Sequence, residues 1–458
     1  MRRILHLFKQ GLAPLLLSLV LLLGGCTSDP HLDPSPPEPA AGQDEPVKSA
    51  PADVPSANNG STGNDPDQQG NDMDQPVDGG TDNNPAPADP NTGTEAPPPD
   101  AGHGSADAEW VAVGDIMMHT PQLPGAFDEA AQRYDFKPWF TDVKPILEQG
   151  DWTLGNLETP IAGKALGLSG FPRFNAPAEL GDALKYAGFT TVTNANNHAM
   201  DRGAKGIAMT LEKLQKLGFD TKGTARSKAE ADKLTIVKKH GIAMGLLAYT
   251  YGTNGIPLPK NQPYAVSLID EAAIIRDIGR LREAGADFIT VCLHFGIEYQ
   301  TMPNDAQKTL ARNLIAAGAD IIAGSHPHVV QPYELAEVTE PDGSVRKGLI
   351  IYSMGNFISN QRGSTKDYGV IYKVHIHKDN TSGLTSIGSV KAIPTWVHRV
   401  LVKGVNHYTV MPVQALLASA PLQDLKASDY SAIKSTYAQL TKRIESMLAK
   451  PVQLQAAP

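Results

Sequence analysis

Histidine residues with the spacing of metal ligands occur at two points of this 458-residue sequence. His326 and His328 flank a single proline, and on extended backbone two side chains two residues apart point to the same side. Each imidazole could then bind one of two divalent metal ions about 3.5–4 Å apart; the alternative is a polar turn after a strand. In the pair Asn197 and His198, the amide oxygen could bind a metal and the imidazole could act as a general acid, or the pair could cap a helix.

Carboxylates and a third histidine follow apolar runs elsewhere in the chain. Asp115 comes shortly after the run 110–113, and Glu158 and His294 end two further runs. Alone, each has an ordinary structural explanation as a polar residue at the end of a strand. Ligands of open α/β sheets bind beyond the carboxyl ends of the strands, so these segments are predicted to deliver their side chains to one edge. Asp, Asn and His together favour Mn, Fe or Zn over Ca.

The elements that would position these side chains alternate along the chain. The order helix, glycine, apolar strand recurs, which is typical of βα units packed on a sheet. The predicted helices cover 178–187, 205–217, 271–284 and 305–317. The predicted strands cover 110–113, 152–157, 189–193, 234–237, 242–248, 288–293, 321–323, 348–352, 369–376 and 387–397. Strands with few helices between them over 234–249 and 328–401 favour two sheets in one sandwich, flanked by helices.

Seven segments occur in the order typical of a known family. They are Val113–Met117, Gly155–Glu158, Phe171–Pro177, Asn194–Asp201, His294–Tyr299, Gly324–Val329 and Ser353–Phe357. Over residues 109–400 the chain resembles the CapA-like family of poly-γ-glutamate capsule synthesis proteins, which is related in fold to calcineurin-like metallophosphoesterases. The resemblance implies an α/β fold arranged as a four-layer α/β/β/α sandwich, with a centre of two divalent metal ions (Mn, Fe or Zn).

The resemblance also implies roles for residues in the matching segments. The metal ligands would be Asp115, His119, Asn156, Glu158, Asn197, His294, His326 and His328. The catalytic residues would be His198 as proton donor, with Asn197 and Glu298. The first two motifs differ from those of metallophosphoesterases. Three residues separate Asp115 from His119 where the usual pair is two apart, and Glu158 follows Asn156 and Leu157 where a bridging aspartate is typical.

An anionic substrate would need donors near this site. The substrate-binding candidates are Arg173, Asn175, Tyr299 and Asn356. Arginine offers a planar fork that fits carboxylates. Arg362 is a further candidate, with a surface salt bridge as its alternative, and Tyr249 and Tyr251 would either line the cleft or fill the core.

The N-terminal segment has the pattern of a lipoprotein signal. Residues 1–26 combine three basic residues with an apolar run over 12–23, which is too short for a comfortable membrane span. Small residues precede Cys26, as in the lipobox of bacterial lipoproteins, so cleavage and lipidation at Cys26 are predicted; an ordinary secretory signal is the alternative. Both interpretations predict export, and lipidation predicts an anchor at the outer surface of the cell membrane.

Residues 27–108 have the composition of a disordered tether. They hold 16 prolines, 9 glycines and no aromatic residue, which is too little apolar area to offset the entropy of ordering. Their 16 acidic residues face a single lysine, so residues 109–458 are near neutral although the whole chain has a formal charge of −9. No basic patch is visible, and no nucleic-acid partner is expected. A domain over 109–405 and a helical extension over 406–458 are predicted, with Cys292 as a buried, inert cysteine.

Three functions fit these observations. In the first, a metal-dependent hydrolase processes a capsule polymer, poly-γ-glutamate by family resemblance, and His198 assists the leaving group. In the second, the domain binds this anionic polymer or membrane synthetase subunits without turnover, a hypothesis that the altered motifs at Asp115 and Glu158 motivate. In the third, a phosphoesterase acts on another phosphorylated substrate, because fold does not fix function.

Overall fold

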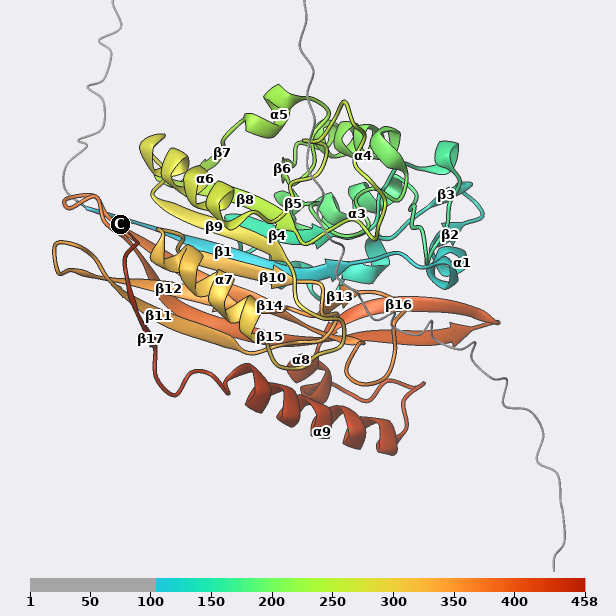
Figure 1. Cartoon of the computed structure of the whole chain (residues 1–458). Helices are drawn as coiled ribbons and strands as arrows, with labels where there is room; N and C mark the ends of the chain where they lie inside the picture. The colour runs from blue at the N-terminus through green and yellow to red at the C-terminus, as the bar shows by residue number, and fades with distance from the viewer. Residues whose placement is uncertain (1–103, 458) are drawn as a thin grey trace, which may run out of the picture. The chain divides into compact units, whose positions relative to one another are not determined.

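Two mixed β-sheets pack face to face in the computed structural model, which describes residues 104–457 (Figure 1). The predictions for the signal segment, for Cys26 and for all but the last residues of the tether lie outside this range. The first sheet has the strand order β16-β15-β14-β1-β4-β5-β6, with β13 paired to β1. The second sheet has the order β17-β11-β12-β10-β9-β8-β7.

The strands of the two sheets differ widely in length. Those of the first sheet are β1 (Ser105–Ile116), β4 (Trp152–Leu157), β5 (Thr191–Thr193), β6 (Asp220–Lys222), β13 (Asn356–Ile358), β14 (Tyr368–Asp379), β15 (Thr385–Val402) and β16 (Val405–Pro412). Those of the second sheet are β7 (Thr235–Lys239), β8 (Ile242–Thr250), β9 (Phe288–His294), β10 (Ile321–Ser325), β11 (Tyr333–Thr339), β12 (Val345–Ile351) and β17 (Val452–Gln455). A short hairpin joins β2 (Phe127–Asp128) and β3 (Arg133–Tyr134).

Helices flank the two sheets. The α-helices are α1 (Leu123–Ala126), α2 (Lys144–Leu147), α3 (Glu179–Ala187), α4 (Gly203–Lys216), α5 (Lys228–Asp232), α6 (Glu271–Glu283), α7 (Asp305–Ala316), α8 (Val413–Ala418) and α9 (Ala427–Ile444). The 3₁₀ turns are η1 (Thr120–Gln122), η2 (Lys137–Phe140) and η3 (Lys164–Leu166). Among residues 104–457, no helix is both long and apolar enough to cross a membrane.

The main core lies between the two sheets. Trp110 and Trp152 of the first sheet and Phe288 of the second are buried there, and the indole N–H of Trp152 donates to the carbonyl oxygen of Val237 at 3.0 Å. Complete burial of a large apolar side chain contributes about 1.5–3 kcal/mol. Separate clusters join α3 and η2 to the outer face of the first sheet, and α6 and α7 to that of the second. The predicted four-layer α/β/β/α sandwich is therefore confirmed.

Local sequence signals explain where the helices begin and end. The side chain of Asp270 accepts the backbone N–H of Ala273 at the start of α6, and Asn304 forms a capping box with Gln307 at the start of α7. Gly285 and Gly318 follow these helices with φ of 85° and 109°, a conformation that glycine adopts without steric cost. The predicted helices accordingly match α3, α4, α6 and α7 closely.

The C-terminal segment departs from the predicted helical extension over 406–458. It contains α8 and α9, but β16 also pairs with β15 and β17 pairs with β11, so both sheets include strands from this segment. Leu440 and Ile444 of α9 are buried in the core between the sheets, and Figure 1 shows α9 beneath β15. The segment is therefore part of the sandwich.

Candidate metal centre

The carboxyl ends of parallel strands from both sheets meet at one edge. In the first sheet, β1, β4 and β5 run parallel, and in the second, β9 and β10 do. The structure brings together the side chains that end or follow these five strands. They are Asp115, Asn156, Glu158, Asn197, His294, His326 and His328. The edge predicted from the strand ends is thus formed by two sheets rather than one.

Glu158 lies at the middle of this cluster. Its carboxylate is fully buried, and its Oε1 has no hydrogen-bond partner among the described residues. Oε1 lies 3.4 Å from Nε2 of His294 and 3.7 Å from Nε2 of His328. Two groups of atoms close enough to share an ion overlap at Glu158, one with Asp115 and His294 and the other with His326 and His328. Glu158 could therefore bridge two metal ions.

Charge and burial at the centre favour a cation. Burial, then the charge of Asp115, raises the pKa of Glu158 well above its usual range. Burial would also raise the pKa of Asp115, but hydrogen bonds from His328 and Asn156 outweigh it and lower that pKa. Burial lowers the pKa of His294 well below its usual value, and that of His326 to about 3. Neutral imidazoles beside carboxylates are the ligands that divalent transition metals bind.

The His326–His328 segment is not extended, which corrects the prediction from its sequence. His326 and His328 have φ of 99° and 57°, so both lie in the left-handed region that costs side-chain-bearing residues about 1–3 kcal/mol. Contacts with Asp115 hold this turn in place. The backbone N–H of His326 lies 3.4 Å from Oδ2 of Asp115, and Nδ1 of His328 lies 3.1 Å from the same oxygen. Nδ1 of His326 is buried and has no hydrogen-bond partner within residues 104–457.

Several polar residues that the sequence analysis did not select support the centre. Oγ of Ser325 lies 2.9 Å from Nδ1 of His294, so it orients that ring. The Asn196 amide donates to Oδ1 of Asn156 at 3.2 Å. Asn156, a predicted ligand, in turn donates to Oδ1 of Asp115 at 2.8 Å, so its amide nitrogen faces that carboxylate. Ser325 is the last residue of β10, so its place at a strand end could have indicated it. Asn196 lies within the selected segment Asn194–Asp201, but no spacing distinguished it from its neighbours.

A pocket of about 380 Å³ opens beside His328 and contains the catalytic candidates His198 and Glu298. His198 is buried, and its Nδ1 donates to Oδ2 of Asp201 at 2.8 Å. The same oxygen accepts the backbone N–H of Phe174 at 2.6 Å, so the carboxylate is itself fixed. Nε2, on the opposite side of the ring, is therefore the nitrogen that the pocket can use.

Comparison with known sequences identifies the family. The family model for bacterial capsule synthesis protein PGA_cap matches residues 109–361. The chain belongs to this family. The capsule biosynthesis protein CapA of Bacillus anthracis is 29% identical over 286 residues, which cover 59% of this chain and 64% of the relative. The PGA biosynthesis protein CapA of Bacillus subtilis (strain 168) is 32% identical over 280 residues, which cover 59% of this chain and 68% of that relative. The chain thus spans about two thirds of the length of these relatives.

Solved structures align with lower similarity. The NAD nucleotidase NadN of Haemophilus influenzae aligns over 74% of this chain and 68% of its own, with 14% identity and a TM-score of 0.41. The calcineurin-like phosphoesterase YfkN of Bacillus subtilis aligns over 74% of this chain and 99% of its own, with 14% identity and a TM-score of 0.40.

His119 of this PGA_cap protein lies outside both metal-binding groups, contrary to its predicted role as a ligand. Its Nδ1 accepts the backbone N–H of Asn360 at 3.3 Å, and burial lowers its pKa to about 4. The intervening residues explain the displacement. The backbone N–H of Met117 donates to Ile358 and that of Met118 to Thr159, so the chain runs on past the centre before His119.

Two of the predicted substrate contacts are structural. The side chain of Asn175 is buried and bonds the backbone of Ala162, Gly163 and Gly167. Asn356 is buried behind the centre, with its Oδ1 3.2 Å from Nδ1 of His328. Neither side chain has polar atoms left for a substrate. Those of Asn175 hold a loop, and Oδ1 of Asn356 contacts the candidate metal ligand His328.

The remaining candidates divide between the pocket and the scaffold. Tyr299 and Glu298 line the pocket, and the ring of Tyr251 lies 4.6 Å from that of His326. Arg173 is exposed in the loop that also places Phe171 in the pocket. The other two candidates lie elsewhere. Arg362 donates to the carbonyl oxygen of Val397, and Tyr249 donates to Asp277 on α6.

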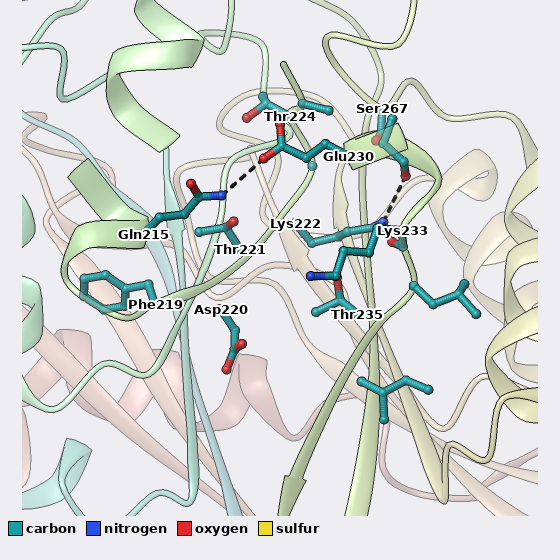
Figure 2. A pocket seen from close by; sticks show the side chains of 15 residues that line it. Gln215, Phe219, Asp220, Thr221, Lys222, Thr224, Glu230, Lys233, Thr235 and Ser267 are labelled. Atoms are coloured by element: carbon teal, nitrogen blue, oxygen red, sulfur yellow. Dashed lines mark hydrogen bonds between the residues drawn. The ribbon is translucent and has the colours of Figure 1, made fainter. Parts of the chain in front are cut away.

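A second polar pocket, of about 280 Å³, lies between β6, β7 and α5 (Figure 2). Its polar groups bind one another. The ammonium of Lys222 donates to the carbonyl oxygen of Lys233 at 2.9 Å, and the amide of Gln215 donates to Glu230 at 3.2 Å. None of the predicted site residues lines this pocket, so it plays no part in the metal centre.

Proposed function

We propose that this PGA_cap protein is a metal-dependent hydrolase that processes an anionic capsule polymer, poly-γ-glutamate. The position of Glu158 carries the proposal. Its buried carboxylate faces Asp115 and three imidazoles, and its Oε1 has no hydrogen-bond donor in the described part of the chain. Two buried carboxylates without a compensating cation cost several kcal/mol, so the arrangement fits a resident divalent metal.

The residues that would hold the metal are those whose side chains converge on Glu158. The ligands would be Asp115, Glu158, Asn197, His294, His326 and His328. Bound there, two ions of the Mn, Fe or Zn class would supply Lewis acidity and lower the pKa of a water. The unpaired Nδ1 of His326 and Oε1 of Glu158 support this donor set, because buried polar atoms normally have partners.

The remaining residues of the pocket bind substrate and move a proton. Asp201 fixes the ring of His198, so that Nε2 can give a proton to the leaving group. Phe174 packs edge-on against the same ring with centroids 4.6 Å apart, which restricts its rotation. Arg173, exposed in the loop beside the pocket, would contact carboxylates of the polymer.

The names of the relatives support the choice of polymer. One relative is named for capsule biosynthesis and the other for PGA biosynthesis. The pocket itself contributes one acidic side chain, Glu298, and no lysine or arginine. Recognition of a polyanion would therefore depend on the metal ions and on Arg173, which is exposed between the pocket residues Phe171 and Phe174.

Metal content is the decisive measurement. Elemental analysis of full-length protein purified in detergent should find two more transition-metal ions per chain in wild type than in His326→Ala. His407→Ala, which removes an exposed histidine from β16, is the matched control and should keep both ions. A folded wild type that stays metal-free after incubation with Mn²⁺ and Zn²⁺ would overturn the proposal.

Cleavage assays on two substrates distinguish the polymer hydrolase from the phosphoesterase alternative. Incubation with poly-γ-glutamate, followed by size-exclusion chromatography, should show shorter polymer with wild type and unchanged polymer with His326→Ala. A parallel assay with a chromogenic phosphodiester tests the phosphoesterase alternative. Cleavage of the phosphodiester alone would reassign the substrate and leave the metal centre intact.

The position of His119 favours a second candidate function. Because His119 lies outside both groups of candidate ligands, the Asp115 side has one ligand fewer than the usual metallophosphoesterase motif supplies. A centre of this kind could bind polymer carboxylates, or help to assemble membrane synthetase subunits, without turnover. Polymer binding that depends on metal, with no change in polymer length and no effect of His198→Ala, would favour this function.

We also propose that the protein is exported and anchored through a lipid on Cys26, a residue outside the described range. The basic start, the short apolar run and the small residues before Cys26 support this location. In cell fractionation, wild type should remain with the membrane and Cys26→Ser should be retained in uncleaved form or released. Identical fractionation together with identical molecular mass of the two proteins would contradict the anchor.

A further inference from the structure

Four side chains of types that can bind or orient a metal ion face one another on the outer surface of the first sheet, far from the candidate metal centre. Asp107 and Glu109 lie on β1, directly opposite His377 and His375 of β14 in the antiparallel register. All four share one face of the sheet, because the alternate residues Ala106 and Ala108 pack against the core. Asp107 precedes Asp115 by eight residues, which places the cluster about 26 Å from the centre at ~3.3 Å per residue.

The donor atoms of three of these residues already converge. Oδ1 of Asp107 lies 2.8 Å from Nδ1 of His377 and 3.0 Å from Nε2 of His375. The three donor atoms that these residues offer lie within 4.8 Å of one another. Zinc bonds of about 2.0–2.2 Å place tetrahedral ligand atoms roughly 3.3–3.5 Å apart, so small side-chain movements would suffice to enclose an ion. Two imidazoles and a carboxylate suit Zn²⁺ and its neighbours rather than Ca²⁺ or Mg²⁺.

Glu109 completes the arrangement in the manner of an orienting residue. Its Oε1 lies 3.3 Å from Nδ1 of His375, so Nδ1–H can donate to Glu109 while Nε2 faces Asp107. A carboxylate behind a histidine is the usual partner of a metal-bound imidazole, since it fixes the tautomer and the ring. Lys373 lies 3.6 Å from the other oxygen of Glu109 and holds that carboxylate.

The backbone around His375 also fixes its ring. On the neighbouring strand β15, a Cβ added to Gly388 would lie 2.9 Å from Cδ2 of His375. Glycine at this position therefore leaves the space that the imidazole occupies. The exposed fractions of the Asp107 and His377 side chains, 52% and 42%, leave the cluster open to an ion from solvent.

We infer that Asp107, His375 and His377 form a surface site for one zinc-class divalent ion, oriented by Glu109. An ion there would join β1 to β14 near the start of β1 and so stabilise the folded domain. A ladder of hydrogen-bonded histidine and carboxylate pairs without an ion is the competing explanation. The inference does not depend on the hydrolase proposal, because no residue is shared between the two sites.

Zinc stoichiometry tests the inference on the full-length protein. Equilibrium dialysis against Zn²⁺ should find one ion fewer in the double variant His375→Gln, His377→Gln than in wild type. His326→Ala should lose the ions of the metal centre but keep the surface ion. The exposed His407→Gln of β16 is the matched control and should bind as wild type does.

Two further readouts make the result unambiguous. Glu109→Gln should weaken the surface ion by about 10–100-fold while leaving its stoichiometry at one, as expected for an orienting residue. In the His326→Ala background, Zn²⁺ should raise the melting temperature, and adding His375→Gln and His377→Gln should remove that rise. Equal zinc binding and an equal thermal response with and without His375 and His377 would overturn the inference.

Discussion

The carboxylate of Asp201 orients the ring of His198, so substitutions at these two residues test the proposed proton transfer. Asp201 accepts from Nδ1 of His198, and its own position is fixed by the backbone of Phe174. If His198 gives the proton to the leaving group, His198→Ala should slow polymer cleavage by about 10²–10³-fold, the usual contribution of a general acid. Asp201→Asn should slow cleavage less, by roughly 10-fold, because the ring remains but loses its fixed tautomer.

The controls for this prediction are within the same chain. Metal content should be unchanged in both variants, which separates proton transfer from metal binding. His240 forms a similar pair with Asp151, at 2.7 Å, on an exposed part of the surface, so His240→Ala should cleave polymer as wild type does. Full activity of His198→Ala would show that another group, or none, donates the proton.

Residue types at strand ends were enough to predict most of the centre. Asp115 follows an apolar run, Glu158 and His294 end two others, and the structure places all three together. Predictions from residue spacing were wrong where the backbone departs from the regular strand conformation that they assume. The left-handed turn at His326 and the displacement of His119 arise from hydrogen bonds to distant strands, which no local pattern records.

At the scale of elements, close approach of two glycine segments positions Asp115. A Cβ added to Gly114 would lie 1.9 Å from the carbonyl oxygen of Gly355, the same oxygen that accepts the Asp115 N–H at 2.9 Å. Gly114→Ala should therefore force β1 away from this segment and destabilise the protein by about 2–4 kcal/mol, measured by denaturant unfolding. The Asp115 carboxylate would move with the strand, so metal content should fall as well.

A helical glycine provides a control of opposite sign. Gly279 lies inside α6, and a Cβ there would meet nothing within 4 Å. Alanine is the better helix former, so Gly279→Ala should stabilise the protein by about 0.5–1 kcal/mol. Equal effects of the two substitutions would show that the contact between Gly114 and Gly355 does not constrain the fold.

Elements with local signals were predictable and elements formed by distant pairing were not. α6 and α7 have caps, an apolar face and a terminal glycine within a few residues of one another. β17 is four residues long and exists because it pairs with β11, more than a hundred residues earlier in the chain. Likewise β16 is a strand because β15 offers it a partner, so the predicted domain boundary fell inside a sheet.

At the scale of the whole molecule, both sheets contribute residues to the proposed metal centre, so metal binding there would be coupled to folding. Asp115, Glu158 and Asn197 come from the first sheet or its loops, while His294, His326 and His328 come from the second. Ions that bind the folded protein only stabilise it by about 2.7 kcal/mol at 100 times the dissociation constant. A chelator should therefore lower the melting temperature of wild type by several degrees.

Glu158→Gln should reverse this dependence. With metal present, the variant should be less stable than wild type, because it loses the carboxylate shared by both groups of ligands.

In chelator, Glu158→Gln should be the more stable protein by about 1–3 kcal/mol, because folding of wild type forces Glu158 to hold an unpaired buried charge or take up a proton. Burial holds the pKa of Glu158 in the folded protein well above the ordinary glutamate value of 4.5. The unfolded chain therefore releases this proton first, and wild type loses stability as the pH rises above 4.5. The difference between the two proteins in chelator should therefore widen from pH 5 to pH 7, and thermal unfolding at both pH values measures it. A constant difference, or a wild type that is the more stable protein in chelator, would show that Glu158 is compensated by groups other than a metal ion.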